Sequence, residues 1–437
     1  MNTCLTITCD TCEQDTDCRI GWSNRLIQPI HFACPHCHSA IDITLDISEA
    51  PPPNISFAGC LPSHNQPDGP FDGTKPFVDL HLDFPARFGD YTPGQTAYFV
   101  ALDQLKAAAD GDHRKAFQLY EFHSLRLKRL NQLYPKADEL KRIINLYHGK
   151  NKQLFQKRAA EFLEEEQEQS TLQQDLNATL YRVIATAFFP FVVYEHGKEI
   201  SENLPQLLGR LDQGMLHLFI SGLYDSSFLT DLQRDCLRIY PRIFDAEVPF
   251  RPALFLDFIK YQEPGYVAGR VSSHDFFGMK DLYKDILEII SRQIVLIAGI
   301  NNLYHRGNFN SFGTIDGGTL GSLQKFSEKP LSERFKYLDD CWYKLSVPDL
   351  DLGLRNAIAH NNVDYNSETQ TLTFYPKGGR LEAVGGNSAS FLAFMRSLLL
   401  GFREMHNLHH VIKSLLYYKA LIYDQRASQE KHAKPFG

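Results

Sequence analysis

The chain has 437 residues, of which 43% are hydrophobic and 22% charged, and its formal net charge is −7. This length exceeds what one ordinary hydrophobic core holds, so we expect two or three domains with the composition of a soluble globular protein. The acidic balance argues against a protein coated in nucleic acid, and any RNA-binding surface must be a local basic patch.

The first residues, Met1–Leu5, lack the basic start and apolar run of a signal peptide. The longest apolar stretch, 286–300, is interrupted by Glu288, Arg292 and Gln293, so we expect no membrane span. Most of the nine cysteines fall within the first 60 residues. Without an export signal, this crowding indicates metal binding instead of disulfides, and we expect a cytoplasmic protein.

Two Cys-x2-Cys pairs organise residues 1–47, and 21 residues separate the pairs. Two tight turns can bring four thiolates into a tetrahedron around Zn²⁺, so the pattern predicts a β zinc ribbon whose stability depends on a structural metal. Unligated buried cysteines are the alternative. The predicted ligands are Cys9, Cys12, Cys34 and Cys37. The residues expected to lie outside the site are Cys4, Cys18, His31, His36 and His38.

Residues 48–95 are rich in Pro and Gly and are predicted to be a linker with one short strand. Within it, Asp79, His81 and Asp83 alternate with leucines, which places the three polar residues on one face of a strand. A metal or acid–base site is one interpretation. We favour the other, a strand whose polar face is in water.

Residues 96–270 show helical periodicity and are predicted to form a helical middle domain, with helices near 96–109, 113–133, 136–168, 172–189, 201–224 and 228–240. The stretch 113–158 holds 12 Lys and Arg against three Asp and Glu, with aromatic residues among them. One interpretation is an RNA-facing surface; the other is a solvated basic face above core rings. The residues chosen as candidate substrate-binding cations are Arg126, Lys128, Arg129, Lys141 and Arg142.

The C-terminal segment, 271–437, is also predicted to be helical, with helices over 281–304, 331–345 (closed by Pro348) and 389–423. The glycines of 313–321 lack the Gly-Lys-Ser/Thr of a phosphate-binding loop, so we expect a flexible loop there. A hairpin is expected across 377–379. Together with a short helix near residue 354, these elements predict a mainly α fold with a four-helix bundle and a small β-hairpin.

That short helix carries the sequence Leu354-Arg355-Asn356-Ala357-Ile358-Ala359-His360. Asn356 and His360 are four residues apart and share one helical face, and Arg355 can reach the same place. The three side chains offer guanidinium, amide and imidazole, which together can bind a phosphate and move a proton. We place this group at the start of the helix.

An Arg, four intervening residues and a His, with a polar residue directly after the Arg and a turn and short strand over 364–375, resembles the Arg-x4-6-His signature of the HEPN superfamily. The resemblance covers roughly 275–426. It implies a helical bundle that forms a homodimer or larger homo-oligomer in which two copies of the motif face each other. It also implies a metal-independent endoribonuclease, often a toxin or an antiphage (abortive infection) effector awaiting a phage-encoded trigger.

In the chemistry that the resemblance implies, His360 takes the proton of the 2′-hydroxyl or protonates the leaving 5′-oxygen of an RNA such as tRNA or mRNA. Arg355 would hold the phosphate, and Asn356 would orient the imidazole or donate to a phosphate oxygen. The products would be a 2′,3′-cyclic phosphate and a 5′-hydroxyl, with zinc only structural. The alternative function is a non-catalytic HEPN dimer that binds a nucleotide, a nucleic acid or a protein beside the zinc ribbon.

Overall fold

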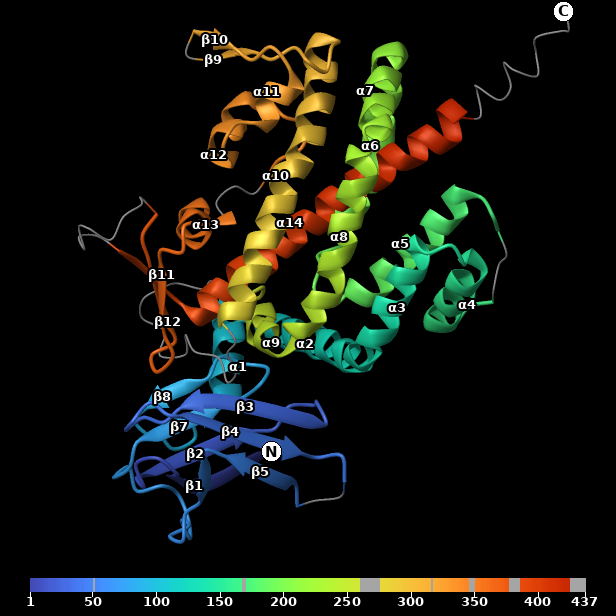
Figure 1. Ribbon diagram of the computed structural model, residues 1–437. Helices are drawn as coiled ribbons and strands as arrows, with labels where there is room; N and C mark the ends of the chain where they lie inside the picture. The colour runs from blue at the N-terminus through green and yellow to red at the C-terminus, as the bar shows by residue number, and fades with distance from the viewer. Residues whose placement is uncertain are drawn as a thin grey trace, which may run out of the picture. The chain divides into compact units, whose positions relative to one another are not determined.

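The computed structural model describes residues 1–49, 52–166, 170–259, 276–315, 317–345, 350–376 and 386–424. Most of these residues lie in helices, which confirms a mainly α fold (Figure 1). Contacts divide the chain into two compact units. Unit 1 holds 1–135, 244–281 and 353–399, and unit 2 holds 136–243, 282–352 and 400–437. The four segments inferred from the sequence stay a prediction.

Unit 1 begins with two β-sheets. One has five strands in the order β6-β1-β2-β7-β8, and the other has three in the order β3-β4-β5. Only the β2–β7 pair is parallel among the described pairs of these sheets. The strands are β1 Asn2–Cys9, β2 Asp15–Gly21, β3 Ile27–Ala33, β4 Ala40–Asp46, β5 Asn54–Ala58, β6 Cys60–Pro62, β7 Phe77–Leu80 and β8 Arg87–Gly89.

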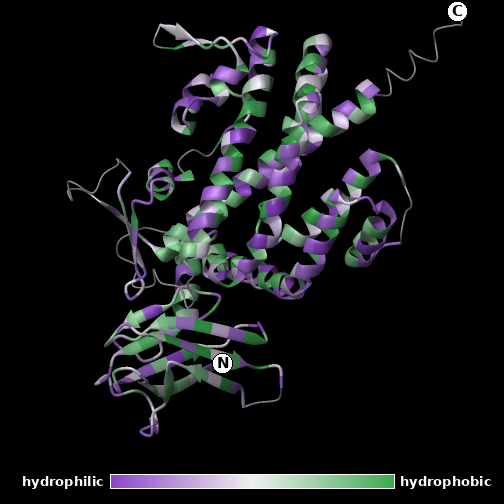
Figure 2. Ribbon diagram, viewed as in Figure 1, coloured by the Kyte–Doolittle hydropathy of each residue, from purple (hydrophilic) through white to green (hydrophobic). Residues whose placement is uncertain are grey.

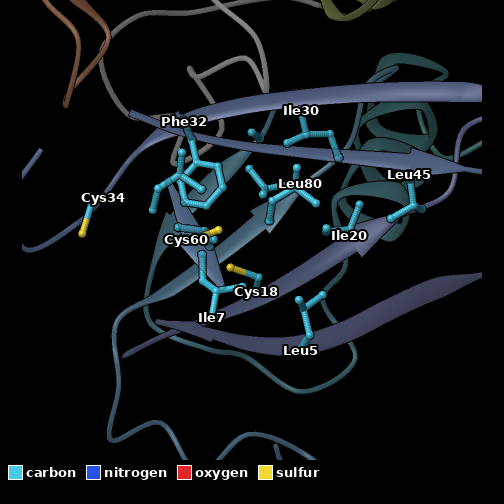
Figure 3. Close-up of a cluster of buried hydrophobic side chains, with 14 of the residues drawn as sticks. Leu5, Ile7, Cys18, Ile20, Ile30, Phe32, Cys34, Leu45, Cys60 and Leu80 are labelled. Carbon is cyan, nitrogen blue, oxygen red and sulfur yellow. The ribbon is translucent and has the colours of Figure 1, made fainter. Parts of the chain in front are cut away.

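Hydrophobic side chains from both sheets share one core. In β4, Ile41, Ile43 and Leu45 are buried while the residues between them are more exposed, which is the period of two of a strand with one face inward. Figure 2 shows hydrophobic residues along these strands, and Figure 3 shows their side chains gathered in one cluster. The segment 48–95 contributes β5, β6, β7 and β8 to this body, more than the one short strand predicted for it.

The helices of unit 1 come from three parts of the chain. They are α1 Ala97–Ala108, α2 His113–Leu133, α9 Glu247–Phe255, most of α13 Leu352–Ala359 and the first residues of α10 Phe276–Arg306 and α14 Phe391–Tyr418. The prediction of a helix over 113–133 is confirmed, since α2 spans these residues. The helix begins there because the Asp112 side chain caps it by accepting hydrogen bonds from the backbone N–H groups of Arg114 and Lys115. A three-stranded sheet, β11 Val363–Asn366, β12 Thr371–Phe374 and β13 Asn387–Ser390, follows α13.

Unit 2 is built from helices, with a short hairpin of β9 Thr314–Ile315 and β10 Gly318–Thr319 where a flexible loop was expected. Two long helices of the prediction are each divided. One breaks at Gly149, before Asn151 caps the next helix, and the other breaks where Asp212 caps α7. The helices are α3 Ala137–His148, α4 Lys152–Leu163, α5 Gln173–Phe188, α6 Tyr194–Arg210, α7 Gln213–Asp225, α8 Phe228–Asp245, α11 Leu323–Ser327, α12 Leu331–Arg334 and the remaining parts of α10 and α14.

The helix predicted over 331–345 is wrong. Only α12 and a 3-10 turn, Phe335–Tyr337, are helical there, and residues 338–345 are not. Side chains of α10 take up the backbone carbonyls that a helix would use: Asn301 donates to Asp339 at 3.0 Å, and His305 lies 3.1 Å from the Asp340 oxygen. Pro348 and the tip expected at 377–379 lie outside the described residues.

Helix α10 is long and apolar enough to cross a membrane by length and composition, and it is the one such helix among the described residues. Within its apolar window, 89% of the residues are buried inside the structure. This burial is the pattern of a core helix in a soluble protein, because a membrane helix exposes its apolar surface to lipid.

Candidate functional sites

Four cysteine side chains come together where β1 and β3 end. The Sγ atoms of Cys9, Cys12, Cys34 and Cys37 all lie within 4.8 Å of one another, so the predicted ligand set is assembled and could hold a metal ion. Across the two pairs, Cys9 Sγ lies 3.7 Å from Cys37 Sγ, and Cys12 Sγ lies 3.8 Å from Cys34 Sγ. Among the described residues, no spare cysteine or histidine of the prediction belongs to this group.

The two Cys-x2-Cys turns have the same backbone geometry. The N–H of Glu13 donates to the Cys9 carbonyl at 2.9 Å, and the N–H of His38 donates to the Cys34 carbonyl at 3.0 Å. Glu13 and His38 both have positive φ, 58° and 67°, which closes each turn tightly and directs its thiols inward. The hydrogen bonds of Ser39 lower the pKa of Cys37 to about 6, whereas burial raises the pKa of Cys34 to about 12, so the four thiols do not ionise alike.

The signature residues lie on α13 and just beyond it. Leu354, Ala357 and Ile358 are buried and anchor the helix, while Arg355 and Asn356 are half-buried. The Arg355 guanidinium donates to Asn356 Oδ1 at 3.2 Å. His360 is exposed and follows the last helical residue. The group therefore lies at the C-terminal end of its helix, and the expectation that it starts the helix is wrong.

A Schellman cap explains this helix end. The N–H of Asn362 donates to the Ala357 carbonyl at 2.8 Å, and that of Asn361 donates to the Ile358 carbonyl at 3.1 Å. Asn361 takes the left-handed conformation, with φ 55°, that this cap requires. His360 is thereby fixed at the cap, and its imidazole makes no hydrogen bond within the described part of the chain. Asn356 accepts from Arg355 and does not bond the imidazole in this structure.

The second Cys-x2-Cys turn contacts the hairpin that follows residues 354–360. His38 Nδ1, one residue after Cys37, lies 3.2 Å from Glu368 Oε2 in the turn between β11 and β12. Both side chains are substantially exposed, so this pair contributes little to stability. It does show that the cysteine cluster and the signature hairpin belong to the same compact unit.

Of the candidate cations, Arg126 is buried. Its guanidinium donates to Asp257 Oδ2 at 2.6 Å and to the Leu254 carbonyl at 3.3 Å, and it lies 5.3 Å from the ring centroid of Phe258. Its contacts therefore connect α2 to the segment after α9, and it is not exposed for an RNA phosphate as the surface interpretation required. The sequence could not show this, because Asp257 is 131 residues away.

The other four cations remain accessible, but they divide between the units. Lys128 is exposed and Arg129 is half-buried on α2 of unit 1, where Arg129 donates to Gln132 at 3.2 Å. Lys141 and Arg142 are exposed on α3 of unit 2. Among the interleaved aromatic residues, Phe117 and Phe122 are exposed while Tyr147 is buried. Neither the RNA-facing surface nor the solvated basic face above core rings therefore describes all of these rings.

The polar face of the segment 79–83 is buried, so the expectation that it lies in water is wrong. Asp79, His81 and Asp83 are all less than 6% exposed. Arg19 donates to both oxygens of Asp79, at 3.1 and 2.8 Å, and Arg251 donates to Asp83 at 2.7 Å. Ion pairs offset the cost of burying these carboxylates. The sequence signal for these residues was their alternation with leucines. The arginines that pair with the two carboxylates come from distant parts of the chain.

Three histidines of α14, His406, His409 and His410, are largely or fully buried in unit 2. The Tyr240 hydroxyl lies 2.9 Å from Nδ1 of both His406 and His409, and His410 Nδ1 lies 3.4 Å from the Ser201 hydroxyl. Burial lowers the pKa of His406 to about 4 and that of His410 to about 2, so both are neutral. Their contacts are internal and fit a structural role.

No protein-family model, curated protein or solved structure matches this chain.

Proposed function

We propose that this protein is a metal-independent endoribonuclease of the HEPN type, with Arg355, Asn356 and His360 as its active-site residues. The observation that carries the proposal is the exposed imidazole of His360, which has no hydrogen-bond partner among the described residues and follows α13 about one turn after the Arg355–Asn356 pair. An imidazole titrates near neutral pH and can act as a general base or acid, and a guanidinium can hold the two oxygens of a phosphate.

In the proposed reaction, a base removes the proton of the RNA 2′-hydroxyl and the 2′-oxygen attacks the adjacent phosphorus. The bond to the 5′-oxygen breaks, that oxygen receives a proton, and a 2′,3′-cyclic phosphate remains. Arg355 offsets the charge that grows on the phosphate, and Asn356 holds the guanidinium in place. One chain supplies one His360, so a homodimer would provide the base from one copy and the acid from the other.

We propose zinc as the metal of the cysteine cluster, in a structural role. A tetrahedron with Zn–S bonds of about 2.3 Å has S···S edges of about 3.8 Å. The observed distances of 3.7 and 3.8 Å fit that edge. Four thiolates leave no open coordination position, so this metal would stabilise the β body without entering the RNA reaction.

We further propose that the enzyme works in the cytoplasm as an antiphage or toxin effector that a phage-encoded trigger activates. Lys128 and Arg129 are the accessible candidate cations in the unit that contains His360, and they are the first choice for contacts to the RNA backbone. Lys141 and Arg142 are the second choice.

The test is RNA cleavage by the purified protein and by His360→Ala, each incubated in EDTA with total RNA and tRNA, with and without lysate of phage-infected cells. Loss of a general acid or base is expected to slow cleavage by about a hundredfold or more. His64→Ala changes another exposed histidine of unit 1 and is the matched control, expected to cleave normally.

If wild type and variant are both inactive in every condition, the catalytic proposal is wrong. The non-catalytic dimer that binds a nucleotide, a nucleic acid or a protein would then be the better account. Equal cleavage by wild type and His360→Ala would also reject the assignment of His360.

A further inference from the structure

A cavity of about 280 Å³ lies in unit 1, apart from the cysteines and the signature. It is bounded by the loop after β2, the segment after β7, the start of α1 and the middle of α2. Its lining includes Trp22, His81, Phe84, Tyr98, His123 and Ser124. The volume is just below the range typical of drug-sized ligands, so it suits a molecule with a single ring system.

Aromatic rings form much of the wall. Phe84 lies in the centre of the group, with its ring centroid 4.7 Å from that of His81, 5.8 Å from His123 and 5.9 Å from Tyr98. Tyr98 in turn lies 5.9 Å from Tyr120. Walls of this kind favour a flat ligand that can stack on a ring face.

The charges beside the cavity are already neutralised. Arg251 uses all five of its N–H donors on protein acceptors: Nε on Asp83, one terminal nitrogen on Asn131 and Glu247, and the other on Ser23 and Asn24. No donor of this guanidinium remains for a phosphate. A metal is also a poor fit, because the cysteine cluster is the one group with metal-ligand spacing among the described residues.

His123 provides unused hydrogen-bonding capacity. It is 1% exposed, and neither ring nitrogen has a hydrogen-bond partner within the described part of the chain. Burial lowers its pKa to about 4, so the ring is neutral and offers one N–H donor and one nitrogen acceptor. Leaving such buried groups unpaired costs free energy, so a ligand that pairs them gains affinity.

A second imidazole has a defined tautomer. The backbone N–H of Asp83 donates to His81 Nδ1 at 3.0 Å, and burial lowers the pKa of His81, so its proton is on Nε2. The hydroxyls of Tyr98, Tyr120 and Ser124 add further donors and acceptors at the lining. The cavity therefore combines aromatic walls, neutral polar groups and no uncompensated charge.

We propose that this cavity binds one uncharged, planar nitrogen heterocycle of nucleobase size. Its ring would stack against the aromatic wall, and its donor and acceptor edge would pair with His123. The base could come from a free nucleoside or from a nucleotide splayed out of an RNA strand, because both present the same chemistry. The proposal does not depend on RNA cleavage, since binding is measured without it.

Trp22 lines the cavity and reports binding directly. In the full chain carrying Trp342→Phe, Trp22 is the one remaining tryptophan, and a stacked base should quench its emission in a saturable way. The probes are adenosine, guanosine, cytidine and uridine, a short oligoribonucleotide, and ribose 5-phosphate as a ligand without a base. For the oligoribonucleotide, the chain also carries His360→Ala so that the probe is not cleaved. The outcome of the cleavage proposal therefore does not affect this binding test.

His123→Phe keeps an aromatic ring of similar shape and removes both nitrogens, so affinity should fall by about tenfold while the fold is retained. His113→Phe makes the same change on the exposed start of α2 and should bind like the parent. Ser124→Phe fills the cavity and should abolish binding, which provides a second variant if His123→Phe does not fold.

Quenching by nucleosides and oligoribonucleotide alike would identify a free base or nucleoside as ligand, and quenching by the oligoribonucleotide alone would identify an RNA base. Either result supports the proposal. Saturable quenching by ribose 5-phosphate alone, or by none of the probes, would overturn it, and so would unchanged binding in both His123→Phe and Ser124→Phe.

Discussion

Arg251→Met is expected to destabilise unit 1 strongly, because the guanidinium is the centre of a buried polar network. Arg251 is fully buried, and its carboxylate partners Asp83 and Glu247 are 5% and 2% exposed. Methionine retains much of the apolar volume but none of the five hydrogen bonds. The substitution therefore leaves acceptors without donors and carboxylates without their main cation.

The size of the effect follows from which charges keep a partner. Glu247 Oε2 still has Arg25 Nε at 3.3 Å, whereas Asp83 loses the cation that lowers its pKa. Breaking one buried ion pair costs about 3–5 kcal/mol, which is a large part of the 5–15 kcal/mol that stabilises a typical domain. Adding Asp83→Asn removes the stranded charge, so the double variant should recover about 2 kcal/mol of the loss.

The assay is urea unfolding followed by Trp22 emission in a Trp342→Phe background. Trp22 is adjacent in sequence to Ser23, which accepts a hydrogen bond from Arg251 at 3.3 Å, so its emission reports on this network. Arg129→Met is the matched control, because Arg129 is half-buried and its guanidinium hydrogen-bonds Gln132 alone among the described residues. The cost of this substitution should stay within about 0.5 kcal/mol.

Two results would refute this reasoning. One is an unfolding free energy for Arg251→Met within about 1 kcal/mol of the parent, which would mean that the buried pair contributes no more than a surface pair. The other is a double variant that is less stable than Arg251→Met, because it would show that the Asp83 carboxylate is not the stranded charge.

Removal of the metal should unfold the β body. Cys12→Ser should contain about one zinc fewer per chain by elemental analysis and should melt at a lower temperature. Cys60→Ala removes a thiol outside the cluster and should keep the zinc. Equal zinc content in the two variants would contradict the ligand assignment. Acidification should weaken unit 2, because His406 and His410 have folded pKa values of about 4 and about 2, below the unfolded value of about 6.5. The unfolded chain then binds more protons below pH 6.5, so the unfolding free energy should fall between pH 6.5 and 4 by up to about 1.4 kcal/mol per pH unit for each histidine. An unchanged urea midpoint at pH 7 and pH 5 would contradict this, and His406→Phe should reduce the slope.

Local patterns in the sequence were sufficient for several features. The helical periodicity predicts α2 with its observed ends, and the cysteine spacing predicts which four thiols meet. In both cases the residues that determine the structure lie close together in the chain or in paired turns of the same type. The helical signal also identified α10 and α14, whose apolar residues repeat over many turns.

Features that depend on distant partners could not be predicted. The alternation at Asp79, His81 and Asp83 indicates a strand face, but its burial depends on Arg19 and on Arg251, 60 and 168 residues away. The burial of Arg126 could not be predicted for the same reason. A cation on a helix is expected to face water unless a carboxylate from a distant part of the chain pairs with it. The prediction of a helix over 331–345 is wrong because side chains of α10 hydrogen-bond the backbone carbonyls of Asp339 and Asp340.

The candidate site at Arg355, Asn356 and His360 was predicted from the sequence by resemblance, and its position relative to the C-terminal cap of α13 required the structure. The left-handed Asn361 ends the helix just before His360, and asparagine is a residue that tolerates this conformation. The cavity beside His123 was not identified from the sequence, because its lining comes from four separate segments. The available signal was two histidines in segments rich in aromatic residues, which are common in structural cores as well.

The most direct test of the central claim is the chemistry of the RNA ends that the protein leaves in EDTA. Attack by the 2′-hydroxyl predicts a 2′,3′-cyclic phosphate on one fragment and a 5′-hydroxyl on the other, with both ends absent after incubation with His360→Ala. Fragments that carry a 3′-hydroxyl and a 5′-phosphate would show that water attacks the phosphate instead, and they would contradict the roles proposed for Arg355 and His360.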